Sequence, residues 1–192
     1  MFSIKKKLAI DGGTYMGEFK RLKRELAYKG TIIEVYKDNI EVNGRQAVWD
    51  FFHHNGGAAV IPVMEDGRIL MVKQFRNAID RYTLEIPAGA FDGSKETGET
   101  CVIRELEEET GYKAEKVEWL ITTRSMVAFT NEKVEIYVAT NLTPSKQCLD
   151  EEESIELEIY TAEELKEKIF KGEIEDSKTV AALMAYFVKY QV

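Results

Sequence analysis

The chain has 192 residues, of which 44% are hydrophobic and 31% charged, a composition typical of a folded globular protein and not of a disordered one. This length suffices for one domain with a sizeable core, with or without a small appendage. The formal net charge of −8 argues against nucleic acid as a partner, because phosphate contacts need clustered Lys and Arg. No apolar run reaches the roughly 18 residues that a membrane span requires, so no membrane role is expected.

Cysteine usage indicates a reducing compartment. Cys101 and Cys148 are too few for a disulfide framework and lack the spacing of metal ligands. The N-terminus carries a basic run, Lys5 to Lys7, but no apolar stretch of the length that a signal peptide needs. We therefore expect a cytoplasmic protein with two ordinary thiols.

Residues 1–52 are expected to form a small antiparallel β region. The segment 16–28 fits a short charged helix, although its pattern leaves the assignment open. From residue 31 the pattern changes to strands, with a break expected at Asp38-Asn39 and a turn at Asn43-Gly44. The expected strands are 31–36, 40–42 and 45–52.

Residues 53–192 are expected to form one further domain of mixed strands and helices. Strands are predicted at 57–64, 68–75, 82–86, 115–124, 132–139 and 154–160, the first two joined as a hairpin through Glu65-Asp66-Gly67. Helices are predicted from about 97 to 111, from the capping box at Thr161 to about 172, and from about 177 onward. This order predicts an α/β fold, an α/β/α sandwich with a mixed sheet.

The first of these helices carries a dense group of carboxylates. Glu105, Glu108 and Glu109 are three and four residues apart, so they share one helix face. An apolar stripe of Val102, Ile103 and Leu106 is expected roughly opposite to it. Arg104 can neutralise part of the negative charge, and three converging carboxylates also suit a hard divalent cation such as Mg²⁺. The cluster alone leaves a solvated acidic face open as the alternative.

Residues at fixed spacing surround this helix. They are Gly89, Glu96, Arg104, Glu105, Leu106, Glu108, Glu109, Gly111 and Tyr112. They resemble the signature of the Nudix hydrolases, Gly-x5-Glu-x7-Arg-Glu-U-x-Glu-Glu-x-Gly-U, in which U is a bulky apolar residue. The spacing agrees from Glu96 onward, whereas six residues instead of five separate Gly89 from Glu96. This departure lies in the loop before the helix and concerns the placement of Glu96.

The similarity extends to the ADP-ribose pyrophosphatase branch of that family over about residues 31–190. It is carried by the segments 56–63, 74–76, 84–89 and 172–180. The resemblance implies the Nudix α/β/α fold. It also implies that the backbone carbonyl of Ala88 joins Glu105, Glu108 and Glu109 in holding the metal, Mg²⁺ with Mn²⁺ as an alternative. Arg76 and Glu85 would then hold the substrate, while Arg104 and Glu105 are counted with the catalytic group.

A general base is also implied by the resemblance, as a Glu on a loop beyond the helix. The acidic run at 150–153 matches that position. Glu151 and Glu153 are the two candidates, with Glu153 favoured and Glu132 next in order. The alternative is a solvated acidic turn.

The implied reaction is metal-dependent hydrolysis of the diphosphate bond of ADP-ribose or a related nucleoside diphosphate sugar, giving a nucleoside monophosphate and a sugar phosphate. Val127 stands sixteen residues beyond Gly111, where ADP-ribose-specific members commonly carry proline. A hydrolase of GDP-mannose type therefore stays open. So do a nucleoside triphosphate pyrophosphohydrolase and a non-catalytic module that binds nucleotide sugars, although the intact Arg-Glu-x-x-Glu-Glu argues against the latter.

The branch resemblance further implies a homodimer, in which residues 1–52 pack against the second subunit and help to form the nucleoside pocket. Residues 31–52 alternate apolar and polar positions without an obvious place in one compact sandwich. Tyr36 and Trp49 are candidates for the interface, for stacking on the base or for a core role. Trp49 is accordingly included among the candidate substrate-binding residues.

Overall fold

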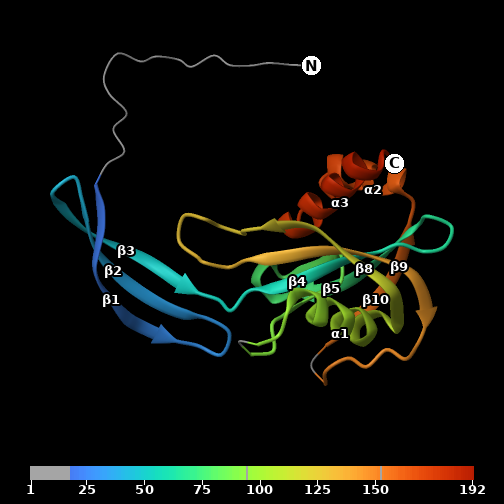
Figure 1. Ribbon diagram of the computed structural model, residues 1–192, viewed down its shortest axis with the longest axis horizontal. Helices are drawn as coiled ribbons and strands as arrows, with labels where there is room; N and C mark the ends of the chain where they lie inside the picture. Colours follow the sequence, from blue (N-terminus) through green and yellow to red (C-terminus); the bar gives the residue numbers. More distant parts are fainter. Residues whose placement is uncertain (1–17, 94, 152) are drawn as a thin grey trace, which may run out of the picture. The chain divides into compact units, whose positions relative to one another are not determined.

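The computed structural model describes residues 18–93, 95–151 and 153–192 (Figure 1). The chain divides into two compact units, Met1–Phe52 and His53–Val192. The basic run from Lys5 to Lys7 lies outside the described residues.

The N-terminal unit is a three-stranded sheet in the order β1-β2-β3. Its strands are β1 (Phe19–Lys29), antiparallel to β2 (Glu34–Val42), and β3 (Arg45–His53). The helix considered for 16–28 is therefore wrong, since the described part of that segment from Phe19 onward is extended. The break expected at Asp38-Asn39 is also wrong, because β2 runs through both residues.

Side-chain pairing across β1 and β2 explains why β2 continues through a sequence that favours turns. Arg24 donates two hydrogen bonds of 2.6 Å to the Asp38 carboxylate, and Asn39 donates one of 3.1 Å to Glu25. The Arg24 guanidinium also lies 3.6 Å from the centre of the Phe51 ring. These cross-strand contacts satisfy side chains that would otherwise bond to their own backbone and favour a turn.

The His53–Val192 unit contains two sheets. The four-stranded sheet has the order β7-β4-β9-β8, with β4 and β9 parallel and the other pairs antiparallel. Its strands are β4 (Gly57–Pro62), β7 (Ala88–Ala90), β8 (Tyr112–Thr123) and β9 (Val134–Pro144). The antiparallel three-stranded sheet has the order β10-β5-β6, from β5 (Ile69–Arg76), β6 (Arg81–Glu85) and β10 (Ile155–Tyr160). The turn predicted at Glu65-Asp66-Gly67 is present, with the Met64 amide donating a hydrogen bond of 2.8 Å to the Arg68 carbonyl and Val63 bridging Ile69 antiparallel. The pairing does not extend further, because β4 and β5 enter different sheets.

Helices cover both faces of the four-stranded sheet (Figure 1). They are α1 (Gly98–Thr110), α2 (Ala162–Phe170) and α3 (Ser177–Tyr190). Side chains alternate along β4: Ala58 and Val60 pack with α1, whereas Ala59 and Ile61 pack with α2, α3 and β5. The predicted α/β/α sandwich with a mixed sheet is confirmed.

Local signals define the ends of α1. Thr97 caps its N-terminus by accepting a hydrogen bond from the Thr100 amide, and Gly111 ends it in the left-handed conformation with φ of 69°. Val102 and Leu106 are buried as predicted, but Ile103 is exposed. Ile103 is one residue, about 100° of helix rotation, away from Val102 and therefore falls outside the apolar stripe.

Both cysteines are free thiols, Cys101 buried and Cys148 exposed. Burial raises the pKa of Cys101 to about 12, so this thiol is unreactive at neutral pH. None of the helices in the described ranges is long and apolar enough to cross a membrane.

Candidate active site

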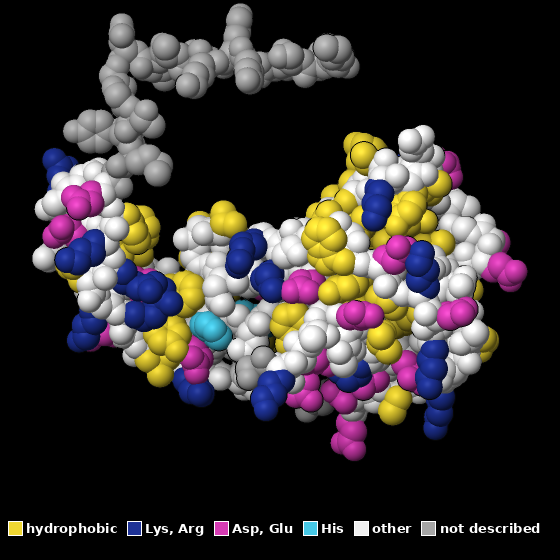
Figure 2. All heavy atoms as spheres, in the orientation of Figure 1, with side chains coloured by type: hydrophobic (Ala, Val, Ile, Leu, Met, Phe, Trp, Pro, Cys, Tyr) yellow, Lys and Arg dark blue, Asp and Glu magenta, His cyan; other side chains and the backbone are white. Residues whose placement is uncertain are grey.

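The acidic face of α1 packs against β7. The Ala88 amide donates a hydrogen bond of 3.0 Å to Glu109, whose side chain is 4% exposed. The Glu105 carboxylate lies so close to Gly89 that any side chain there would overlap it. Glu105 and Glu109 therefore converge on the backbone segment predicted to supply the carbonyl ligand, and are not simply solvated. Figure 2 shows acidic side chains gathered at the lower edge of this unit, where α1 lies.

Arg104 stands between these carboxylates. Its Nη1 donates hydrogen bonds of 2.6 Å to Glu105 and 2.9 Å to Glu108, and its Nε donates one of 3.1 Å to Glu96. Glu96 therefore reaches Arg104 although the loop that precedes the helix is one residue longer than in the signature. With Arg104 in this position, the described residues contain no group of three acidic, His or Cys side chains already gathered as metal ligands.

The chemistry of the site nevertheless fits a divalent cation. Burial raises the pKa of Glu109 to about 8, with the charge of Glu105 adding to the effect, and burial also raises the pKa of Glu105. The donors are all oxygen, from three carboxylates and the Ala88 carbonyl, which is the ligand type that Mg²⁺ and Mn²⁺ prefer. A pocket of about 280 Å³ opens beside Ala88, Glu105 and Glu108. A cation there would offset negative charge that one amide and one arginine compensate only in part.

The predicted base loop reaches this same pocket. Glu153 lines it together with Ala88, Glu105 and Glu108, whereas Glu151 does not. Glu132, the third candidate, lines a separate pocket of about 370 Å³ that also borders Ala88. The structure therefore brings Glu153, among the three candidates, next to the carboxylates of α1.

Arg76 and Glu85 form an ion pair in which the carboxylate is buried and the guanidinium is partly exposed. Arg76 donates two hydrogen bonds of 2.7 Å to Glu85, which is 2% exposed, and Thr83 donates another of 2.6 Å. Lys178 also donates to the Glu85 carboxylate. Burial alone would raise the pKa of Glu85, but the hydrogen bonds from Arg76 and the charge of Lys178 outweigh it and bring the pKa to about 2. Both Glu85 oxygens are thus engaged in orienting cations beside a pocket of about 410 Å³.

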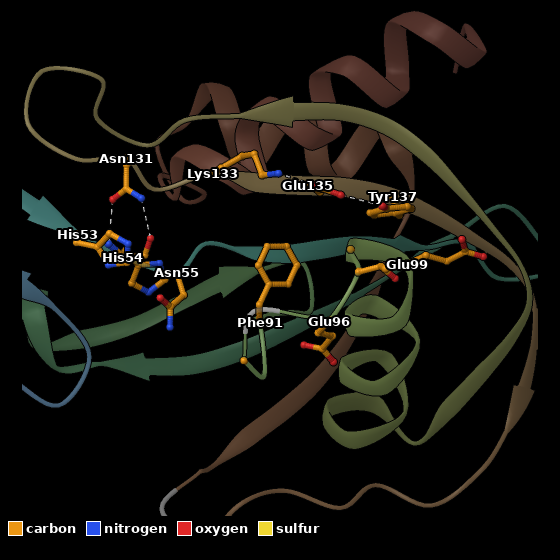
Figure 3. A pocket seen from close by; sticks show the side chains of 13 residues that line it. His53, His54, Asn55, Phe91, Glu96, Glu99, Asn131, Lys133, Glu135 and Tyr137 are labelled. Atoms are coloured by element: carbon orange, nitrogen blue, oxygen red, sulfur yellow. Dashed lines mark hydrogen bonds and ion pairs between the residues drawn. The ribbon is translucent and has the colours of Figure 1, made fainter.

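A larger hollow of about 840 Å³ lies at the N-terminus of α1 (Figure 3). None of the predicted catalytic, metal or substrate residues lines it. Its lysine is already paired, since Lys133 donates a hydrogen bond of 2.7 Å to Glu135, which also accepts one of 3.0 Å from Tyr137. The reactive groups therefore gather at the smaller pockets around Ala88, and not in this hollow.

Comparisons with known proteins identify the family. The model of the NUDIX domain matches residues 53–183. The chain belongs to the Nudix family. It is 36% identical to the methanol dehydrogenase activator of Bacillus methanolicus and 35% identical to the ADP-ribose pyrophosphatase of Bacillus subtilis, in each case over 86% of this chain and 91% of the relative. A solved structure titled "Crystal structure of ADP compounds hydrolase" superposes with a TM-score of 0.83 at 20% identity, covering 93% of this chain and 98% of that one.

In this Nudix chain the N-terminus of α3 contributes residues that the sequence did not single out. Lys178 pairs with Glu85 and with Asp176, at 2.9 Å from the latter, and lines both the 370 Å³ and the 410 Å³ pockets. Its segment, 172–180, carried part of the family resemblance but no assigned role. The Asp176 side chain caps α3, a signal that marks a helix start and does not reveal its partners.

Trp49 lies in the N-terminal unit. Its ring is half-exposed, and its centre lies 5.6 Å from that of Phe19. A role for Trp49 in substrate binding stays a prediction.

The ion pair of Glu85 predicts a pH-dependent contribution to stability. Glu85→Gln should lower the free energy of unfolding by roughly 3 kcal/mol at pH 7, because the native pKa lies near 2 and the ordinary value is 4.5. A depressed pKa contributes stability that is fully present above the unfolded pKa. The difference between wild type and variant should therefore shrink as the pH falls from 4.5 toward 2.

Urea unfolding at pH 7 and pH 3 measures this difference. Glu156→Gln is the control, because Glu156 forms an exposed pair with Lys73 at 3.1 Å and should change stability little at either pH. A difference for Glu85→Gln that is equal at both pH values would contradict the assignment.

Proposed function

We propose that the protein hydrolyses the diphosphate bond of ADP-ribose or a related nucleoside diphosphate sugar, giving a nucleoside monophosphate and a sugar phosphate. The observation that carries this proposal is the convergence of Glu105 and Glu109 on the Ala88–Gly89 backbone, beside a pocket that Glu105, Glu108 and Glu153 line. The similarity to the ADP-ribose pyrophosphatase of Bacillus subtilis supports the choice of substrate class.

Glu105, Glu108, Glu109 and the Ala88 carbonyl are the proposed metal ligands, with Mg²⁺ as the cation and Mn²⁺ as the alternative. When bound, such a cation neutralises charge on the diphosphate oxygens and acidifies a water molecule. Arg104 must then yield part of its contact with Glu105 and Glu108, and its bond to Glu96 keeps it close to the site.

Glu153 is the proposed general base. A carboxylate can accept the proton of the attacking water once it comes within hydrogen-bond reach. Glu153 belongs to the connection between β9 and β10, which can adjust to a bound substrate more readily than the helix that holds the other glutamates. Its present hydrogen bond, 3.3 Å from the Asp150 amide, is weak enough to be exchanged.

Arg76 and Lys178 are proposed to bind the anionic groups of the substrate. Arg76 uses its Nε and Nη2 donors on Glu85, which leaves Nη1 directed to other partners. A planar guanidinium held in this way is preorganised for the oxygens of a phosphate. Lys178 adds a second positive charge at the junction of two pockets.

The substrate proposal is tested with a panel of nucleoside diphosphate sugars and nucleoside triphosphates in Mg²⁺, with products identified by mass. We expect ADP-ribose to give AMP and ribose phosphate. A preference for GDP-mannose would keep the reaction and change the substrate. Release of pyrophosphate from triphosphates alone, or binding without turnover of any compound, would contradict the proposal.

The base is tested by comparing Glu153→Gln with Glu151→Gln. Glu153→Gln should lower kcat by about a hundredfold or more while it keeps the affinity for a non-hydrolysable analogue. Glu151→Gln should turn over nearly normally, because that residue does not line the pocket. Glu108→Gln is the reference for loss of a metal ligand, and excess Mg²⁺ should rescue it in part. If both variants turned over normally, the base would lie elsewhere and Glu132 would be the next candidate.

A homodimer through the N-terminal sheet is also proposed. Among the described residues of that unit, Ile40 is the one hydrophobic side chain that is fully buried, whereas Phe19, Leu26 and Trp49 are about half-exposed. A three-stranded sheet with so little core gains stability by burying its apolar face against a partner.

Both cysteines are free, which supports the proposed cytoplasmic location.

Sedimentation at micromolar concentration should give twice the chain mass of 22.0 kDa. Trp49→Glu should shift the mass toward the monomer, because it places a charge on the proposed interface. Val188→Glu is the control, since Val188 is an apolar side chain that is more exposed than Trp49, 75% against 51%, but lies on α3. A wild-type monomer of 22.0 kDa would refute the dimer.

A further inference from the structure

The N-terminus of α3 is hydrogen-bonded to the segment that leads into β7. The Ile86 amide donates a hydrogen bond of 3.1 Å to Thr179 Oγ1. The Thr179 hydroxyl in turn donates one of 2.6 Å to Asp176, and the Thr179 amide donates another of 2.9 Å to the same carboxylate. Thr179 is completely buried, so solvent cannot replace these bonds.

This contact is one of several that hold residues 85–88. Glu85 is fixed by Arg76 and Lys178, and the Ala88 amide is fixed by Glu109. The Pro87 carbonyl accepts a hydrogen bond of 2.9 Å from the Val60 amide. Thr179 supplies the restraint between Glu85 and Pro87. Asp176 and Lys178 also border the pocket of about 370 Å³ that Ala88 lines.

The bond from Ile86 does not serve α3 itself. The helix is capped by the carboxylate of Asp176, which accepts the Thr179 amide. Valine at position 179 would fill nearly the same volume and keep that cap. The specific consequence of the Thr179 hydroxyl is therefore the placement of the Ile86 amide, two residues before Ala88.

We propose that Thr179, oriented by Asp176, is a positioning residue that sets the Ala88 carbonyl against the carboxylates of α1, so that metal affinity depends on a residue outside the Nudix signature. The inference rests on the proposed function through the role of Ala88 as a ligand. Loss of the hydrogen bond between the Ile86 amide and Thr179 would let Ile86 shift and carry the Ala88 carbonyl with it, while the glutamates stay fixed on α1.

Thr179→Val and Thr179→Ser test the proposal by direct titration of Mn²⁺, followed by the electron paramagnetic resonance signal of the free ion. Thr179→Val should weaken Mn²⁺ binding roughly five- to tenfold, the effect of about one hydrogen bond. Thr179→Ser keeps the hydroxyl and should bind within about twofold of wild type. The Ile86 amide should exchange its hydrogen faster in the Val variant, while the KM for substrate at saturating metal stays unchanged.

Thr161→Val is the matched control, because Thr161 caps α2 by accepting the Glu164 amide at 3.2 Å and lies outside the candidate site. It should lower the thermal midpoint and leave Mn²⁺ affinity unchanged. If Thr179→Val fails to fold, Asp176→Asn preserves the helix cap, frees the Thr179 hydroxyl in part, and should still weaken Mn²⁺ binding. If wild type binds Mn²⁺ and the affinity is unchanged in Thr179→Val, or in Asp176→Asn where Thr179→Val does not fold, the positioning role alone would be overturned. Wild-type protein that binds no Mn²⁺ would overturn the proposed metal site together with this inference.

Discussion

The packing of the acidic face of α1 on β7 is the constraint on which the site depends. Gly89 lets the Glu105 carboxylate approach the backbone, and the Ala88 amide holds Glu109 in a buried position. Burying these carboxylates is unfavourable unless positive charge lies close by. Arg104 supplies it to Glu105 in this structure, whereas Glu109 accepts its hydrogen bond from the uncharged Ala88 amide, and a divalent cation would supply it to both in the proposed enzyme. Burial of these carboxylates therefore lowers stability and at the same time favours the binding of a cation.

A second group of charged side chains, around Glu85, has equal numbers of anions and cations. Glu85 and Asp176 face Arg76 and Lys178, two anions and two cations joined by short hydrogen bonds. Loss of hydration offsets part of the attraction in such partly buried pairs, so that removing one partner costs more than the pair contributes in net stability. As a result, the Nε and Nη2 edge of the Arg76 guanidinium is held by Glu85, while Arg76 also lines the pocket of about 410 Å³. This arrangement suits the binding of a phosphate.

Features encoded by neighbouring residues could be predicted from the sequence, and features that depend on contacts across the fold could not. The boundaries of α1 and the shared face of its glutamates follow from caps and helical spacing. The strand at Phe19–Lys29 was missed because its charges are paired with β2 across the sheet. Lys178 was missed because its partner Glu85 is 93 residues away in sequence. The direction of the acidic face, toward β7, likewise depends on how the sheet is assembled.

The shortness of β7 explains why polar side chains concentrate around it. This strand has three residues and lies at the edge of its sheet, so only three residue pairs join it to β4. So short a ladder fixes a backbone carbonyl poorly. Of the six buried polar or charged side chains in the described ranges, Glu85 ends β6, three residues before Ala88, and Glu109 and Thr179 bond to the segment around β7. A sheet that cannot fix its own edge is therefore fixed by side chains from two helices on opposite faces, which ties the position of Ala88 to both.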